Sequence, residues 1–275
     1  MAKKPKTLSL LKTPRTVELE YYKQLKQLAN EMKKDINETI LPILENVSLD
    51  SKYTKDVGVT DLLSALNILQ GKYSNTFAFA TRVANSVVSR LLNMGNDKFR
   101  KTLEGAYGVD VGRMINQNKL NDLVALQRRK QEVLIKSIPA QFFNQIEMII
   151  QNGVSGNKTY KSIANEIKGI SGISSVYGKL DNRVKLIARN EISTINANLN
   201  NARAESAGIT RATWQTSGDE RVRGINPKDS QDHESLDGEE FDIKVGLRDP
   251  RSGEMVTPGS AINCRCQAIY IIPEN

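Results

Sequence analysis

The chain of 275 residues holds 39 Lys or Arg and 31 Asp or Glu, which gives a formal net charge of +8 at pH 7. This length is sufficient for a buried core without disulfides, and no stretch approaches the roughly 18 apolar residues of a membrane span. Two cysteines separated by one residue exclude a disulfide framework, so we expect folding in a reducing compartment. The basic N-terminus lacks the apolar region of a secretory signal, and we expect no membrane association.

The positive charge is concentrated in the first part of the chain. Residues 1–180 carry 27 Lys or Arg against 16 Asp or Glu, a net charge of +11, whereas residues 181–275 carry 12 against 15, a net charge of −3. A polyanion bound to the first part would explain this division. A solvated, lysine-rich helical surface would explain it equally well.

Residues 1–16 contain five basic side chains and no acidic one. Pro5 and Pro14 disfavour a helix, so we expect a basic flexible arm. This arm either docks on nucleic acid or on an acidic protein surface, or serves as a solubilising tail. The candidate nucleic-acid-binding residues are Lys3, Lys4, Lys6, Lys12 and Arg15.

Residues 17–152 are predicted to form a helical bundle or arm, because apolar residues recur there at steps of three and four. Their apolar stripes are expected to form a core and not a cofactor site. Pro42 and Pro139 are expected to interrupt helices. The predicted helices cover residues 17–40, 60–71, a segment from about 74 to 105, 120–137, and a further segment beginning at Pro139.

Residues 153–275 are predicted to form a small α+β domain, with Gly153 and Gly156 at its boundary. A short helix over 159–168, a flexible connector over 169–175 and a long helix from about Asp181 to a C-cap at Gly208 come first. Side chains then alternate with a period of two, which indicates strands. The predicted strands cover residues 212–216, 241–245 and 268–272, the last as an interior strand of a mostly antiparallel sheet.

Polar residues on and after the long helix are predicted to form a structural network. Arg189, Asn196 and Arg203 are spaced by seven and form one stripe. Glu191 falls at the edge of the apolar face and requires a partner, for which three arginines of the next segment are candidates. The network comprises Arg189, Glu191, Asn196, Arg203, Asp219, Arg221, Arg223 and Arg265.

His233, Cys264 and Cys266 are candidate metal ligands, because two thiolates and an imidazole suit zinc. Asp232, Glu234 or Asp237 would complete a tetrahedral site. The alternative is that both cysteines are small buried residues without a metal. A metal-dependent nuclease or related phosphoryl-transfer enzyme centred on His233 is a further alternative. We favour a salt-bridge lattice over catalysis and expect no enzymatic activity.

The ordered set of rare residues resembles the Mu F-like minor head proteins of tailed bacteriophages over about residues 150–270. Asn190 departs from the family's usual Thr, and the loop between Arg223 and His233 is longer than expected. The matching residues are Ile187-Ala188-Arg189-Asn190-Glu191, Asn196, Arg203, Gly208, Trp214, Asp219-Glu220-Arg221-Val222-Arg223, His233, Leu236-Asp237-Gly238, Pro258-Gly259 and Asn263-Cys264-Arg265-Cys266.

The resemblance implies a low-copy virion protein that takes part in head morphogenesis. It implies a place in the head interior near the portal vertex, and in the host cytoplasm during assembly. The implied partners are the portal protein, packaged double-stranded DNA bound without sequence preference, and other capsid or scaffolding proteins. The fold expected from pattern and resemblance together is α+β, with a long-helix N-terminal portion followed by helices packed on a small, mostly antiparallel sheet.

Overall fold

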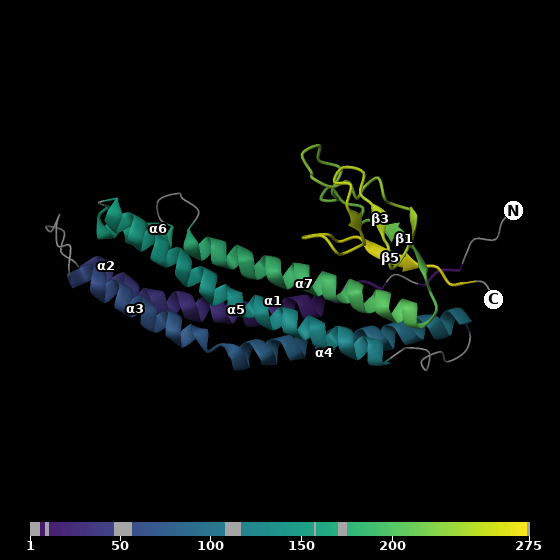
Figure 1. Ribbon diagram of the computed structural model, residues 1–275, viewed down its shortest axis with the longest axis horizontal. Coiled ribbons are helices and arrows are strands. Elements are labelled where there is room, and N and C mark those ends of the chain that lie inside the picture. The colour runs from purple at the N-terminus through teal and green to yellow at the C-terminus, as the bar shows by residue number, and fades with distance from the viewer. Residues whose placement is uncertain are drawn as a thin grey trace. The chain divides into compact units, whose positions relative to one another are not determined.

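The computed structural model describes residues 6–8, 11–46, 57–107, 117–156, 158–169 and 175–273. Lys3, Lys4 and residues 170–174 of the expected connector lie outside these ranges. Helices occupy most of the chain before residue 207, and short antiparallel strands follow, which confirms the α+β prediction (Figure 1). None of the described helices is both long and apolar enough to cross a membrane.

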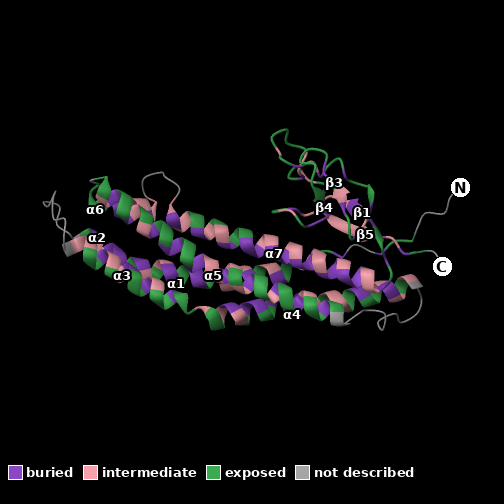
Figure 2. Ribbon diagram, viewed as in Figure 1, coloured by how far each residue is buried: buried purple, intermediate pink, exposed green. Residues whose placement is uncertain are grey.

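The helices are bounded as follows: α1 Arg15–Asp35, the π-helical turn η1 Ile36–Ile40, α2 Leu41–Asn46, α3 Val57–Ser74, α4 Phe77–Tyr107, α5 Gln117–Ser155, α6 Tyr160–Lys168 and α7 Val176–Ser206. The strands are β1 Arg211–Gln215, β2 Glu240–Asp242, β3 Leu247–Arg248, β4 Met255–Val256 and β5 Gln267–Tyr270. Buried and exposed residues alternate along the helical ribbons, as the predicted apolar stripes require (Figure 2).

Both prolines that were expected to interrupt helices are accommodated. Before Pro42 the helix widens into the π turn, and the Leu41 N–H bonds the Ile36 carbonyl. A proline lacks an N–H and crowds the carbonyl four residues earlier, so a widened turn relieves both problems. Pro139 lies inside the continuous α5, and the prediction of two separate helices there was wrong. The flanking side chains Ile138 and Phe142 are buried, and this packing outweighs the roughly 3 kcal/mol that an interior proline costs.

The described chain divides into two compact units that do not follow the sequence order. One unit contains residues 1–18, 85–128 and 189–275, and the other contains 19–84 and 129–188. The predicted boundary near Gly153 falls inside the second unit. Gly153 belongs to α5, and a Cβ there would lie 2.5 Å from the Ile163 side chain of α6. This glycine therefore permits close packing of two helices.

The second unit is a helical bundle with a few polar contacts inside it. The fully buried Tyr21 hydroxyl donates to Gln131 Oε1 at 2.9 Å. Asp181 accepts from Lys26 at 2.7 Å and from Lys33 at 2.5 Å, so one carboxylate of α7 joins two turns of α1. Helix α6 begins at the predicted place, because Thr159 caps it by accepting the Ser162 N–H at 3.2 Å.

The first unit contains the sheet, in which β1 is central and the order is β2-β1-β5. Ala212 pairs with both Phe241 and Tyr270, and β3 and β4 form a separate antiparallel pair. The strand predicted over 268–272 is therefore a flanking strand, not an interior one. Its outer side pairs with the N-terminal segment, since Thr7 bridges Ile271.

The N-terminal segment is docked where the structure describes it. The Leu8 N–H donates to the Tyr270 carbonyl at 2.9 Å, and the Ile272 N–H donates to the Lys6 carbonyl at 2.8 Å. Leu8 and Leu11 are buried, with 1% and 5% of their surface exposed. The expectation of a flexible arm therefore does not hold for residues 6–8 and 11–16. The burial of Leu8 and Leu11 and the backbone pairing with β5 stabilise the docked segment, although its basic side chains favour contact with water.

Candidate metal centre

The path of the chain into the site is set by the end of α7. The Gly208 N–H bonds the Glu205 carbonyl at 3.0 Å, and the Ile209 N–H bonds the Ala204 carbonyl at 2.9 Å. This is a Schellman motif, and Gly208 adopts the left-handed φ of 76° that it requires. The predicted C-cap is confirmed, and the chain turns directly into β1.

The three predicted metal ligands converge in the first unit. His233 lies in the loop between β1 and β2, whereas Cys264 and Cys266 immediately precede β5. One ligand atom from each residue lies within 4.8 Å of the other two. His233 Nδ1 is 3.5 Å from Cys264 Sγ and 3.8 Å from Cys266 Sγ. All three residues are buried, and His233 is only 1% exposed.

The cluster is fixed by its surroundings. The His233 ring stands edge-on to the fully buried Trp214 of β1, with centroids 5.2 Å apart. The His233 backbone N–H donates to the Arg223 carbonyl at 2.9 Å. The Gly259 N–H points at Cys264 Sγ at 3.4 Å. His233 Nε2 is buried without a hydrogen-bond partner in the described part of the chain.

The two thiols have opposite pKa shifts because they share a proton. Donation from the Cys266 S–H to the Cys264 sulfur, with help from His233, lowers the pKa of Cys264 to about 4. The same contact, reinforced by burial, raises the pKa of Cys266. The two sulfurs and the imidazole nitrogen together form an electron-rich donor set.

None of the three acidic residues predicted to complete a tetrahedral site belongs to this cluster of described side chains. Asp232 Oδ1 accepts the Ser235 N–H at 3.2 Å, and Asp237 Oδ1 accepts the Thr216 N–H at 2.6 Å. Glu234 is exposed. Among the described residues, the site thus presents three ligand atoms and not four.

The buried position of His233 bears on the alternative that it is a catalytic acid or base. Such a group must reach within hydrogen-bonding distance of its substrate. Here Nδ1 faces two sulfurs and Nε2 is enclosed. This arrangement favours a structural role for the imidazole over proton transfer to a nucleic acid.

The predicted polar network resolves into separate groups. Asp219 accepts from Arg221 at 3.1 Å and also from Arg265, and these contacts, with Arg265 the stronger, hold the pKa of Asp219 well below its usual range. Arg223 donates to Gln231 and to the Ile262 carbonyl. Each of the three arginines that were candidates for Glu191 thus has a described partner other than Glu191.

Glu191 is held by its neighbour on α7. Asn190 donates from Nδ2 to Glu191 at 3.1 Å, and its Oδ1 accepts the Asn263 N–H at 2.9 Å. Asn263 has a φ of 61°, a left-handed conformation that asparagine tolerates. Asn190, which departs from the expected Thr, therefore ties α7 to the loop that carries the cysteines.

The remaining residues of the stripe on α7 serve other segments. Asn196 Nδ2 donates to the Leu11 carbonyl at 3.3 Å and so holds the N-terminal segment. Arg203 is fully buried and donates to Asn96 of α4, to Asn200, and to the carbonyl of Leu92. Arg189 lines a surface hollow near the cysteines.

Asp249 is a structural residue that the sequence reasoning missed. It is fully buried, and its carboxylate accepts N–H groups from Arg251 at 3.0 Å, Ser252 at 2.8 Å and Asp232 at 2.7 Å. Burial raises the pKa of Asp249, but these donors outweigh that effect and the pKa is lowered overall. Asp249 opens the sequence Asp-Pro-Arg-Ser-Gly, and an Asp in the first position of such a turn is a sequence signal for this role.

Comparison with known proteins identifies the region that carries the site. Residues 144–269 match the family described as Phage Mu protein F like protein, so this part of the chain is similar to that family. The resemblance drawn from residues 150–270 is thereby confirmed. The chain is also 26% identical over 268 residues to an uncharacterized protein of Haemophilus influenzae, covering 96% of this chain and 55% of that protein. The chain thus spans about half the length of that relative. No solved structure matches the chain.

Proposed function

We propose that this protein is a minor head component of a tailed bacteriophage that takes part in head morphogenesis. In this proposal it lies inside the head near the portal vertex, bound to the portal and to packaged DNA. The family match over residues 144–269 supports the role in the head. The distribution of positive charge supports contact with DNA, because phosphate contacts need cations but no particular base sequence.

A cationic hollow in the first unit is the observation that carries the DNA contact. This hollow has a volume of about 480 Å³ and is lined by the start of α1, the middle of α7 and the segment around Cys264. Its cations are Lys12, Arg15, Arg189 and Arg265, against one lining carboxylate, Glu18. Only Arg265 forms an ion pair with another described residue, Asp219. The other three charges are available for phosphate groups.

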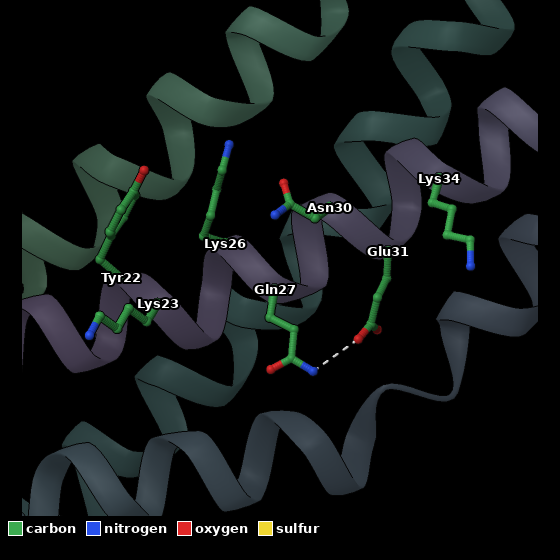
Figure 3. Close-up of a pocket in the computed structure, with 7 residues that line it drawn as sticks. All are labelled: Tyr22, Lys23, Lys26, Gln27, Asn30, Glu31 and Lys34. Carbon is green, nitrogen blue, oxygen red and sulfur yellow. Dashed lines mark hydrogen bonds between the residues drawn. The ribbon is translucent and has the colours of Figure 1, made fainter.

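The lysine-bearing face of α1 in the second unit is less suited to this role (Figure 3). Lys26 pairs with Asp181 at 2.7 Å, and Lys34 lies 3.8 Å from Glu38. Gln27 donates to Glu31 on the same face at 3.0 Å (Figure 3). Carboxylates therefore offset much of the positive charge of this face.

The DNA contact is tested by replacing Lys12, Arg15 and Arg189 with Gln together. We expect weaker binding to any duplex. In a plot of log K against log salt concentration, the negative slope should become shallower by about one for each phosphate that is no longer neutralised. The control replaces Lys23 and Lys34, both from the α1 face, with Gln and is expected to retain most of the affinity. Fluorescence anisotropy with two unrelated duplexes between 50 and 200 mM salt makes the measurement.

Equal affinity and equal slope in the triple variant and the wild type would reject the hollow as the DNA-binding surface. The portal association has its own test. Co-expression with a portal protein should yield a ring-shaped assembly that retains this chain through size-exclusion chromatography. Elution of the chain apart from the ring at every salt concentration would reject the association.

A further inference from the structure

We propose that His233, Cys264 and Cys266 bind one zinc ion, which ties the loop between β1 and β2 to the start of β5. His233 precedes Cys264 and Cys266 by 31 and 33 positions, and the three ligands meet in a buried place beside Trp214. A zinc ion at this point would make the fold of the unit depend on a metal.

The distances fit a tetrahedral site. With Zn–S of about 2.3 Å and Zn–N of about 2.0–2.1 Å, the tetrahedral angle puts sulfur and nitrogen about 3.6 Å apart. The observed distances from His233 Nδ1 are 3.5 Å to Cys264 Sγ and 3.8 Å to Cys266 Sγ. The two sulfurs lie within 4.8 Å of one another. An ion can therefore enter with little movement of the side chains.

The chemistry of the donors selects the metal. Two sulfurs and an imidazole suit zinc, whereas magnesium and calcium require oxygen ligands. The Gly259 N–H directed at Cys264 Sγ is the kind of outer contact that holds a metal-bound thiolate. Binding releases the proton from each thiol that still carries one, because the thiolate is the ligand.

The fourth ligand position is assigned to a water molecule. The described side chains supply three ligand atoms, and Cys264 also lines the hollow that opens to solvent. Water can therefore reach the metal from the side of Cys264.

A simple burial of two small thiols explains less of the structure. It accounts for the exposures of 5% and 6% at Cys264 and Cys266, but it gives no reason for the buried His233 to turn Nδ1 toward the two sulfurs. The sheet of this unit has strands of 5, 3 and 4 residues. A metal cross-link is a common means of stabilising so small a structure.

The test measures metal content in the full chain, purified in reducing buffer without chelator. We expect elemental mass spectrometry to find about one zinc ion per chain. Metal-free protein titrated with cobalt should develop the absorption of tetrahedral cobalt and a sulfur-to-cobalt charge-transfer band. Cys264→Ser and Cys266→Ser should each reduce that band, whereas His233→Gln should weaken binding while leaving the band in place.

The matched control is Tyr270→Phe, which removes a buried polar atom from β5 without touching the cluster. It should bind cobalt as the wild type does. The wild-type titration decides the matter even if the ligand variants fail to fold. The proposal would be overturned if folded wild-type protein with two titratable thiols took up neither zinc nor cobalt. A disulfide between Cys264 and Cys266 under reducing conditions would overturn it as well. DNA retention does not depend on either result.

Discussion

Replacing Arg203 is expected to be among the most destabilising single changes in the first unit. The guanidinium is fully buried, and its described partners are neutral: Asn96 Oδ1 at 2.7 Å, Asn200 Oδ1 at 2.7 Å, the Leu92 carbonyl at 3.0 Å and the Leu91 carbonyl at 3.4 Å. Burial lowers the pKa of Arg203 to about 10, and Tyr270 opposes this only in part. The charge is thus costly to bury, and its hydrogen bonds offset that cost.

The expected magnitude follows from these contacts. Arg203→Ala removes four hydrogen bonds from a charged donor, at about 1.5 kcal/mol each. It also removes the burial cost of the charge, which the lowered pKa places at about 3 kcal/mol. Loss of the packed stem adds about 2 kcal/mol, so the net loss is about 5 kcal/mol. Arg203→Met keeps the stem, and its expected loss is about 3 kcal/mol.

Urea unfolding followed by tryptophan fluorescence measures this effect, because Trp214 is the only tryptophan and is fully buried in the same unit. The control is Arg100→Ala on α4, where an exposed arginine lies 3.7 Å from Glu104 and its loss should cost at most about 0.5 kcal/mol. An Arg203→Met variant as stable as the wild type would refute the reasoning, because it would show that the hydrogen bonds do not offset the burial of the charge.

Two further substitutions probe buried contacts of the same unit. Asp249→Asn should cost about 2 kcal/mol at neutral pH, because the amide cannot accept all three N–H groups. The pKa of Asp249 is lowered in the folded state, so the stability that its carboxylate contributes is present above about pH 4 and is lost as the pH falls below that value. The variant and the wild type should therefore become more alike in unfolding free energy at low pH, and a difference that stays constant down to pH 2 would contradict this. Gly95→Ala should lower the free energy of unfolding by about 1–3 kcal/mol despite the better helix propensity of alanine, because its Cβ would lie 2.5 Å from the Arg203 guanidinium. A thermal midpoint equal to or above that of the wild type would contradict this expectation. The control is Gly71→Ala, whose Cβ would have nothing within 4 Å.

The sequence alone determined the local elements and the composition of the site. The cap at Thr159, the left-handed turn at Gly208 and the alternation around Trp214 each depend on residues within a few positions of one another. The gathering of His233 with the two cysteines was inferred from side-chain chemistry, because few arrangements suit two thiols and an imidazole.

Only the tertiary structure decided which polar residues met. Arg203 bonds Asn96, 107 positions earlier, and Asn196 bonds Leu11, 185 positions earlier. The same holds for Pro139, whose helix continues because its neighbours are buried by distant elements. Periodicity tells which face of a helix is covered but not what covers it. The element that covers a helix face is determined by the free energy of packing between segments that lie far apart in the chain.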